Sequence, residues 1–127
     1  MAEYDRVSLW GNFTDGEYND KMIYESRDTM IVNYCGQKGA KNDRYIGPGN
    51  YFFYKNKKSG EYKFVGRVIQ YHLIRTEVYN EKNINIYELV ISKEPVLTFR
   101  IKHDAYKHFG WKESGLDYRS GIIKHVM

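Results

Sequence analysis

The stretch from Gly47 to Gln70 limits what this chain can fold into more than any other. Two apolar runs, Tyr51–Tyr54 and Tyr62–Gln70, flank a polar segment, Lys55–Glu61, that contains a Ser-Gly pair. Apolar runs joined by a short polar turn are typical of an antiparallel β-hairpin. The preceding Gly47-Pro48-Gly49-Asn50 suits a type II turn, because proline fixes φ at the second position and glycine accepts a positive φ at the third. The sequence therefore predicts a hairpin in the middle of a small, curled sheet.

Other runs rich in β-branched and aromatic residues predict short strands. These runs are Val7–Trp10, Met22–Tyr24, Asp28–Tyr34, Asn85–Ser92 and Val96–Ile101. Asp104–Phe109, followed by Gly110, predicts one or two helical turns, and Gln37–Arg44 is a second place for an irregular turn of helix. Because closure removes exposed edges, we expect a single domain (1–127) of mainly β (α+β) class: a small antiparallel pseudo-barrel with one or two short helices.

Turn-forming residues set the expected strand boundaries. Tyr71–Thr76 either prolongs the second hairpin strand or bends through a bulge, and the polar Glu77–Asn83 follows as a turn. Glu94-Pro95 is expected to end the strand before it, because proline lacks the N–H that a central strand donates. Cys35–Asn50 is predicted to be a long basic loop, and a loop of this length inside a compact domain is usually functional or mobile.

Composition excludes several classes of protein. The single cysteine, Cys35, excludes an intrachain disulfide framework and a Cys-rich zinc site, and it fits a reducing compartment. No apolar run approaches the roughly 18 residues that span a bilayer. The first residues also lack the pattern of a signal peptide. We therefore expect a cytoplasmic or nuclear location, or the interior of the host cell for a viral protein, and no membrane partner.

The charge and the tyrosine content bear on binding partners. The formal net charge is +4, which permits an anionic partner without demanding one. The 13 tyrosines are the unusual feature of the composition. Two explanations stay open: the codon bias of an A+T-rich genome, or a surface that stacks on a ligand.

Two sets of residues are candidates for ligand binding. Aromatic residues at predicted strand ends can form a cage, in which a flipped base gains roughly 1–3 kcal/mol per stacked ring. An arginine within an apolar strand either faces solvent or holds a polar ligand. The predicted ligand-binding set is Trp10, Tyr34, Tyr54, Arg67 and Tyr71. Basic residues of two loops can attract phosphate independently of base sequence. The predicted phosphate-binding set is Lys38, Lys41, Arg44, Lys55, Lys57 and Lys58.

Each set has a structural alternative. Tyrosine and tryptophan rings also pack the interior of barrels with their polar tips in water. Lysines on strand ends and loops also form a solvated face that protects an edge from aggregation. The sequence alone leaves these alternatives open.

Nothing in the sequence has the pattern of an active site. The four histidines are scattered, and His103 and His108 are five residues apart, which does not place them on one helix face. No cysteine or acid has a metal-ligand spacing, and a lone cysteine such as Cys35 is more often inert packing than a nucleophile. Tyr45-Ile46-Gly47 matches half of the GIY-YIG nuclease motif, but the other half is missing. We therefore expect no catalytic residue, metal or cofactor.

A series of short motifs runs along the first half of the chain: Trp10-Gly11, Ala40-Lys41-Asn42, Gly47-Pro48-Gly49-Asn50, Tyr51-Phe52-Phe53-Tyr54 and Phe64-Val65-Gly66-Arg67-Val68. This order resembles the EVE domains of the PUA-like superfamily, which carry an early aromatic strand, a Lys/Arg-Asn pair, a Gly-Asp turn, a strand ending in Tyr and a strand built around Val/Ile-Gly. Asn50 stands where the family usually has Asp, and Lys55 where it often has His. The resemblance covers about a third of the chain.

The resemblance implies a pseudo-barrel with a pocket at one mouth, where relatives bind nucleic acids and some hold a flipped, modified base in an aromatic cage. The first hypothesis is therefore a non-catalytic PUA/EVE-like module for nucleic acid, a nucleotide or a modified nucleobase, with Cys35–Asn50 as a lid. The alternative is a small viral or phage-type structural protein whose tyrosines cover protein–protein contacts, including those of a homo-oligomer. An enzyme without a recognisable motif is the third alternative.

Overall fold

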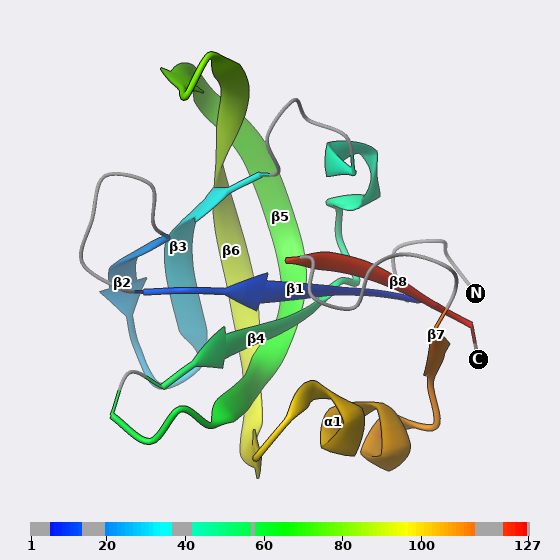
Figure 1. The fold of residues 1–127 in the computed structure, drawn as a ribbon. Helices are drawn as coiled ribbons and strands as arrows, with labels where there is room; N and C mark the ends of the chain where they lie inside the picture. The colour runs from blue at the N-terminus through cyan, green and yellow to red at the C-terminus, as the bar shows by residue number, and fades with distance from the viewer. Residues whose placement is uncertain (1–5, 14–19, 37–41, 57, 114–120, 127) are drawn as a thin grey trace.

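A computed structural model describes residues 6–13, 20–36, 42–56, 58–113 and 121–126. These residues form one mixed β-sheet with one α-helix, which confirms the mainly β fold class (Figure 1). The strands are β1 (Val7–Gly11), β2 (Lys21–Glu25), β3 (Thr29–Cys35), β4 (Tyr51–Lys55), β5 (Tyr62–Tyr79), β6 (Lys82–Phe99), β7 (Lys112–Glu113) and β8 (Ile122–Val126). The helix is α1 (Lys102–Phe109), and η3 (Asp43–Tyr45) is a short 3₁₀ helix. The strand order is β2-β3-β6-β5-β4-β1-β8-β7.

The predicted central hairpin is confirmed as β4 and β5, which pair antiparallel. The turn before it also has the expected form. Gly49 has a φ of 103°, and the Asn50 N–H donates to the Gly47 carbonyl. The Asn50 side chain, fully buried, accepts from the Gly47 N–H and donates to the Tyr45 carbonyl. The turn is therefore stabilised by the buried Asn50 side chain as well as by its own backbone hydrogen bond.

The β5–β6 hairpin is longer than the sequence predicts. Both strands have 18 residues, and they meet at Asn80 and Glu81, whose φ angles of 47° and 64° are those of a type I′ turn. The prediction that Glu94-Pro95 ends a strand is wrong, because β6 continues to Phe99. Phe64 pairs with Leu97, and the next paired residue, Gly66, faces Lys93. Proline is tolerated because the ladder is irregular there and does not need its N–H.

Bulges bend this long hairpin. The register between β5 and β6 shifts at three places, Phe64/Gly66, Val68/Gln70 and Leu73/Arg75. Each bulge bends a strand and increases its twist. The sheet consequently curls, and its inner face encloses a hydrophobic cluster. Each of β1, β3, β4, β5, β6 and β8 contributes to this inner cluster, with Leu9, Val32, Phe52, Val68, Leu89 and Ile122.

One pair of strands departs from the expected antiparallel sheet. β1 lies parallel to β4, with Leu9 beside Phe52 and Trp10 beside Phe53. The other edge of β1 pairs antiparallel with β8. Parallel neighbours need a long connection, and here the chain forms β2 and β3 on the far side of the sheet before returning to β4. Local patterns do not reveal such a pairing.

The outer side of β1 and β4 carries a second, aromatic cluster under α1. The Trp10 and Phe53 rings stack with centroids 4.0 Å apart and planes 12° apart. The outer cluster comprises Trp10, Phe53, Phe64, Phe99, Ala105, Tyr106, Trp111 and Ile123. Gly110, with a φ of 72°, ends α1 as predicted and directs the chain to Trp111. Both faces of this part of the sheet are therefore buried.

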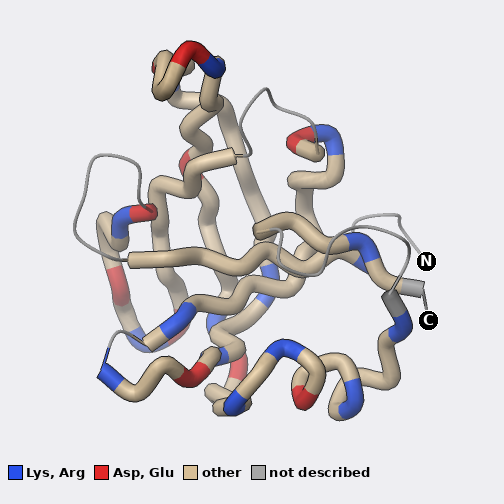
Figure 2. The backbone as a smooth tube through the Cα atoms, in the orientation of Figure 1, with Lys and Arg blue, Asp and Glu red and all other residues tan. Residues whose placement is uncertain are grey.

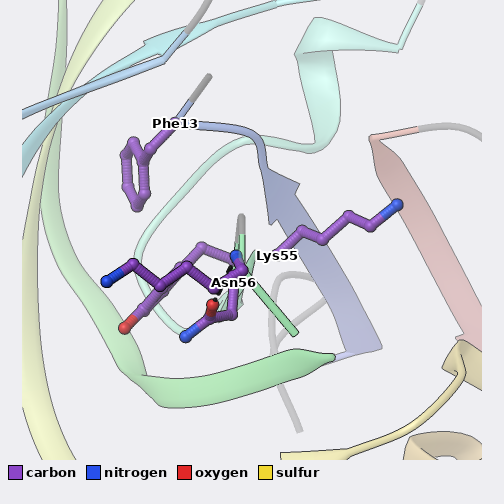
Figure 3. Close-up of a pocket in the computed structure, with 5 residues that line it drawn as sticks. Phe13, Lys55 and Asn56 are labelled. Atoms are coloured by element: carbon purple, nitrogen blue, oxygen red, sulfur yellow. Dashed lines mark hydrogen bonds between the residues drawn. The ribbon is translucent and has the colours of Figure 1, made fainter. Parts of the chain in front are cut away.

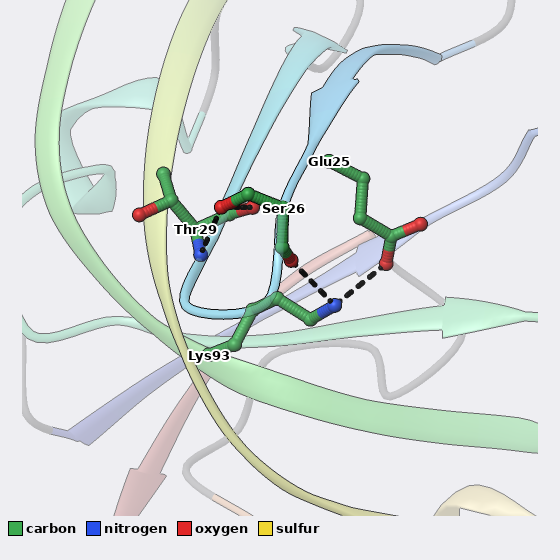
Figure 4. A network of polar contacts seen from close by, with 4 residues as sticks. All are labelled: Glu25, Ser26, Thr29 and Lys93. Atoms are coloured by element: carbon green, nitrogen blue, oxygen red, sulfur yellow. Dashed lines mark hydrogen bonds and ion pairs between the residues drawn. The ribbon is translucent and has the colours of Figure 1, made fainter.

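A lysine fastens the β2–β3 hairpin to the sheet (Figure 4). Lys93 of β6 donates to the Glu25 carboxylate at 2.9 Å and to the Ser26 carbonyl at 3.1 Å. The backbone N–H of Lys93 also donates to the Asp28 carbonyl. Because Lys93 is mostly covered, these contacts hold the edge hairpin against the sheet more firmly than an exposed ion pair would.

Asp20 bridges β1 and β3, which are not neighbours in the sheet. Its carboxylate accepts the backbone N–H of Asn12 at 2.6 Å and that of Cys35 at 2.7 Å. The Asp20 N–H donates in return to the Asn12 carbonyl. On the same side of the curl, the Tyr34 hydroxyl donates to the Gly121 carbonyl at 2.6 Å. These bonds tie together the two sides of the curled sheet.

We expect Asp20→Ala to lower the free energy of unfolding by about 2 kcal/mol at pH 7, because two partly buried backbone N–H groups lose a charged acceptor. Urea unfolding measures the change. Asp28→Ala removes an exposed acid from the β2–β3 turn and serves as the control. Equal stability of the two variants would contradict the bridging role of Asp20.

Candidate ligand-binding site

The structure places two of the predicted cage residues in the core. Trp10 is buried in the outer cluster, and its indole N–H donates to the Ser8 hydroxyl at 2.8 Å. Tyr34 is buried in the inner cluster, against the Phe52 ring. The two rings therefore lie on opposite faces of the sheet and do not converge. Their placement matches the structural alternative, in which such rings pack the interior.

Arg67 and Tyr71 lie apart from those rings. The Arg67 Nε donates to the Gly49 carbonyl at 2.7 Å, and its guanidinium lies 3.9 Å from the centroid of the Tyr51 ring. Arg67 thus supports the turn before β4. Tyr71 is 40% exposed, and its ring centroid lies 6.5 Å from that of Tyr87.

Tyr54, the remaining cage residue, lines an open cavity of about 410 Å³ at the end of the β4–β5 hairpin (Figure 3). The other lining residues are Phe13, Lys55, Asn56 and Lys58. The Phe13 and Tyr54 ring centroids are 5.2 Å apart, with planes tilted by 51°. Both rings also pack on the inner cluster, which holds them in place. The cavity therefore offers two fixed aromatic surfaces beside lysines.

The β4–β5 turn positions the polar groups of the cavity. The Asn56 side-chain oxygen accepts the backbone N–H groups of Lys58 and Ser59 at 2.9 and 3.2 Å. Gly60, with a φ of 73°, allows the chain to turn back to Glu61, whose carbonyl accepts the Asn56 N–H. Because its oxygen is used in the turn, Asn56 has its Nδ2 group to offer to a ligand.

The predicted phosphate-binding residues separate into three groups. Lys55 and Lys58 line the cavity. Arg44 lies at η3 instead, where it stacks over the Tyr45 ring and donates to its hydroxyl. Lys38, Lys41 and Lys57 lie outside the described residues. Figure 2 shows that basic positions recur along the β4–β5 turn and α1, at the lower edge of the view.

Sequence reasoning missed Phe13 and Asn56. Phe13 lies outside every run that predicts a strand or helix, and it reaches Tyr54 because β1 pairs beside β4, with Gly11 next to Tyr54. No local pattern reveals this contact. A signal for Asn56 did exist, since an asparagine that opens a polar turn often bonds to the backbone two residues later.

Sequence reasoning also missed a buried serine–histidine pair. The Ser8 Oγ and His125 Nε2 atoms lie 2.6 Å apart, and the His125 ring stacks on Trp111 with centroids 4.0 Å apart. The Ser8 hydroxyl also accepts the indole N–H of Trp10, so Ser8 links the His125 ring to Trp10. Burial lowers the pKa of His125 from 6.5 to about 3. Both residues are almost fully buried, so the pair has a structural role.

Cys35 has the properties of a packed thiol. Burial, together with the Asp20 carboxylate nearby, raises the pKa of Cys35 to about 12. The thiolate, which is the reactive form, is therefore scarce at neutral pH. Within the described ranges, no three His, Cys, Asp or Glu side chains are grouped so that they could hold a metal ion. In the same part of the chain, no helix is both long and apolar enough to cross a membrane.

Comparison of this chain with protein-family models, with curated proteins and with solved structures finds no match in any of the three.

Proposed function

We propose that this protein is a non-catalytic binding module for nucleic acid or a nucleotide-like ligand, and that the ligand occupies the cavity between Phe13 and the β4–β5 turn. The observation that carries the proposal is the grouping of two fixed rings with lysine and amide donors around one open cavity. A nucleobase stacks on aromatic rings, and its phosphate is attracted by ammonium groups. The resemblance to EVE domains of the PUA-like superfamily supports the same class of ligand, including modified bases.

The chemistry of the cavity favours binding over catalysis. Tyrosine, lysine and asparagine recognise planar, polar and anionic groups without forming covalent bonds. The cavity is open, so a base joined to a longer chain can enter it and leave it. Lys58, on the exposed turn, supplies a charge that needs little rearrangement to meet a phosphate.

We expect Tyr54→Leu to weaken oligonucleotide binding roughly fivefold to 150-fold, because a stacked ring contributes about 1–3 kcal/mol. Fluorescence anisotropy with short single strands, with and without a modified base, measures the affinity at about 50 and 200 mM salt.

Lys58→Gln should reduce the slope of log affinity against log salt by about 0.7, the value for one phosphate contact to a single strand.

Tyr24→Leu is the matched control, since Tyr24 is an exposed tyrosine on β2 that does not line the cavity. It should bind as the unmodified protein does. Absence of binding by the unmodified protein at low salt would reject the proposed function.

The alternative function, protein–protein contact, is favoured by a different observation. Several large apolar side chains are exposed on β2, β5 and β6, with Val78 73% exposed. Tyr24, Ile31 and Val90 are successive cross-strand partners on β2, β3 and β6. Apolar groups of this kind occur at interaction surfaces. A concentration-dependent oligomer in analytical ultracentrifugation, combined with no affinity for nucleic acid, would support this alternative.

A further inference from the structure

Two lysine ammonium groups gather at the ring of Tyr62. The Nζ atom of Lys55 lies 6.0 Å from the ring centroid, and that of Lys102 lies 5.9 Å from it. Lys55 comes from β4 and Lys102 from the start of α1, so two separate elements bring positive charge to one ring. Lys102 also lies 5.0 Å from the ring of Trp10. We call Lys55, Tyr62 and Lys102 the Tyr62 cluster.

The Tyr62 cluster lies on the face of the β4–β5 hairpin opposite the Tyr54 ring. Tyr54 is paired with Lys63, and Lys55 with Tyr62. Successive side chains of a strand point to opposite faces. Tyr54 packs on the inner cluster and Tyr62 on the outer one. Figure 3 shows the Lys55 side chain extending away from Phe13, so its ammonium belongs to the second face although its base lines the cavity.

The end of this hairpin therefore presents a tyrosine ring beside a lysine on both of its faces. The cation–π attraction between each ammonium group and the Tyr62 ring is modest at an exposed site, about 0.5–1 kcal/mol. A phosphate that approaches either ammonium group forms a charge-assisted hydrogen bond with it. The chemistry of the Tyr62 cluster thus matches a phosphate with a base beside it.

We propose that the Tyr62 cluster is a second contact site for the ligand, and that the ligand is consequently a single-stranded polynucleotide that passes around the end of the β4–β5 hairpin. This inference rests on the proposed function, since it extends the ligand from the Tyr54 cavity to the other face. A single strand fits this geometry because its bases are free to stack on separate rings while its backbone follows the lysines. A free nucleotide reaches one face only.

The experiment compares a thymidine mononucleotide with oligothymidylates of about four and eight nucleotides, lengths that single-strand binding modules cover. The double variant Lys55→Gln/Lys102→Gln should bind the longest strand roughly tenfold more weakly and reduce its salt slope by about 1.4, which corresponds to two phosphate contacts. Its affinity for the mononucleotide should fall less than its affinity for the longest strand, because Lys55 lines the cavity with its base and Lys102 does not line it. Lys21→Gln/Lys82→Gln, which removes two exposed lysines elsewhere, is the control with the same net charge.

The outcomes separate this inference from the proposed function. If Tyr54→Leu weakens every ligand while the double variant equals its control, the second contact is refuted and the proposed function stands. If no ligand binds, the proposed function and the second contact are both refuted. The same holds if Tyr54→Leu does not change the affinity for any ligand. Should the double variant unfold, Lys55→Gln alone decides. Lys55 is exposed, and its change should cost more affinity for the long strand than for the mononucleotide.

Discussion

Gly66→Ala is expected to destabilise this protein by at least about 3 kcal/mol, because the added methyl group has no space. A Cβ atom at position 66 would lie 2.0 Å from the carbonyl oxygen of Ser92 and 3.0 Å from the Cα of Lys93. These are backbone atoms of the neighbouring strand β6, so no side chain can move aside. β5 and β6 would have to separate at the place where the register shifts between Phe64 and Gly66.

Gly60→Ala is the matched control for that variant. Gly60 lies in the β4–β5 turn with a φ of 73°, and a Cβ there would meet no atom within 4 Å. Its cost is the backbone strain of a left-handed residue alone, about 1–2 kcal/mol. Urea unfolding midpoints of the two variants, with their slopes, give the comparison. If Gly66→Ala were as stable as Gly60→Ala, the close approach of β5 to β6 would be wrong.

His125 is expected to make the protein sensitive to acid. Its pKa is lowered from 6.5 to about 3 by burial in the folded protein, so the unfolded chain takes up a proton first as the pH falls. The stability contribution of the neutral ring is complete above about pH 6.5 and is lost progressively down to about pH 3, by about 1.4 kcal/mol for each pH unit. Between pH 6.5 and pH 4 this loss amounts to about 3 kcal/mol.

Asp20 opposes this effect over part of the range. Burial raises its pKa from 3.8 to about 6, although its two backbone hydrogen bonds act in the opposite direction. The stability contribution of its protonated form is present below about pH 3.8 and is lost as the pH rises through about 6. Acidification from pH 6 to pH 4 therefore strengthens the fold through Asp20 while it weakens the fold through His125.

The variant His125→Gln isolates the histidine, because glutamine keeps a polar side chain that can bond to the Ser8 hydroxyl but does not take up a proton. The free energy of unfolding is measured at pH 7 and at pH 4 for both proteins. The variant does not lose the contribution of a neutral His125 on acidification, so its change should lie about 3 kcal/mol above that of the unmodified protein. His72→Gln removes an imidazole from a largely exposed position and serves as the control. Identical changes for His125→Gln and the unmodified protein would contradict a neutral, buried His125.

Much of the local structure could be predicted from the sequence. The β4–β5 hairpin, the turn at Gly49 and the end of α1 at Gly110 depend on glycine conformations and on apolar alternation, which neighbouring residues specify. Tyr54 was a candidate as an aromatic residue at a predicted strand end, and Lys58 as a basic residue of the hairpin turn. Both line the same cavity, because that short turn lies at the end of the strand that carries Tyr54.

Other features depend on which strands meet. Pro95 continues β6 because the facing strand is irregular there, and Phe13 reaches Tyr54 because β1 pairs in parallel with β4. Trp10 and Tyr34 were candidate cage residues, yet the two faces of the curled sheet bury them in separate clusters. A position at a strand end is equally compatible with a buried ring and with a ring in a cage, so the sequence does not distinguish the two.

The sequence by itself determined the mainly β class, the central hairpin and the lysines around its turn, because these follow from short-range periodicity and backbone preference. Only the tertiary structure decided which rings are covered, that the sheet is mixed, and that the hairpin end carries a ring and a lysine on each face. Burial and strand pairing are properties of residues far apart in the chain, and they arise only when the sheet curls on itself.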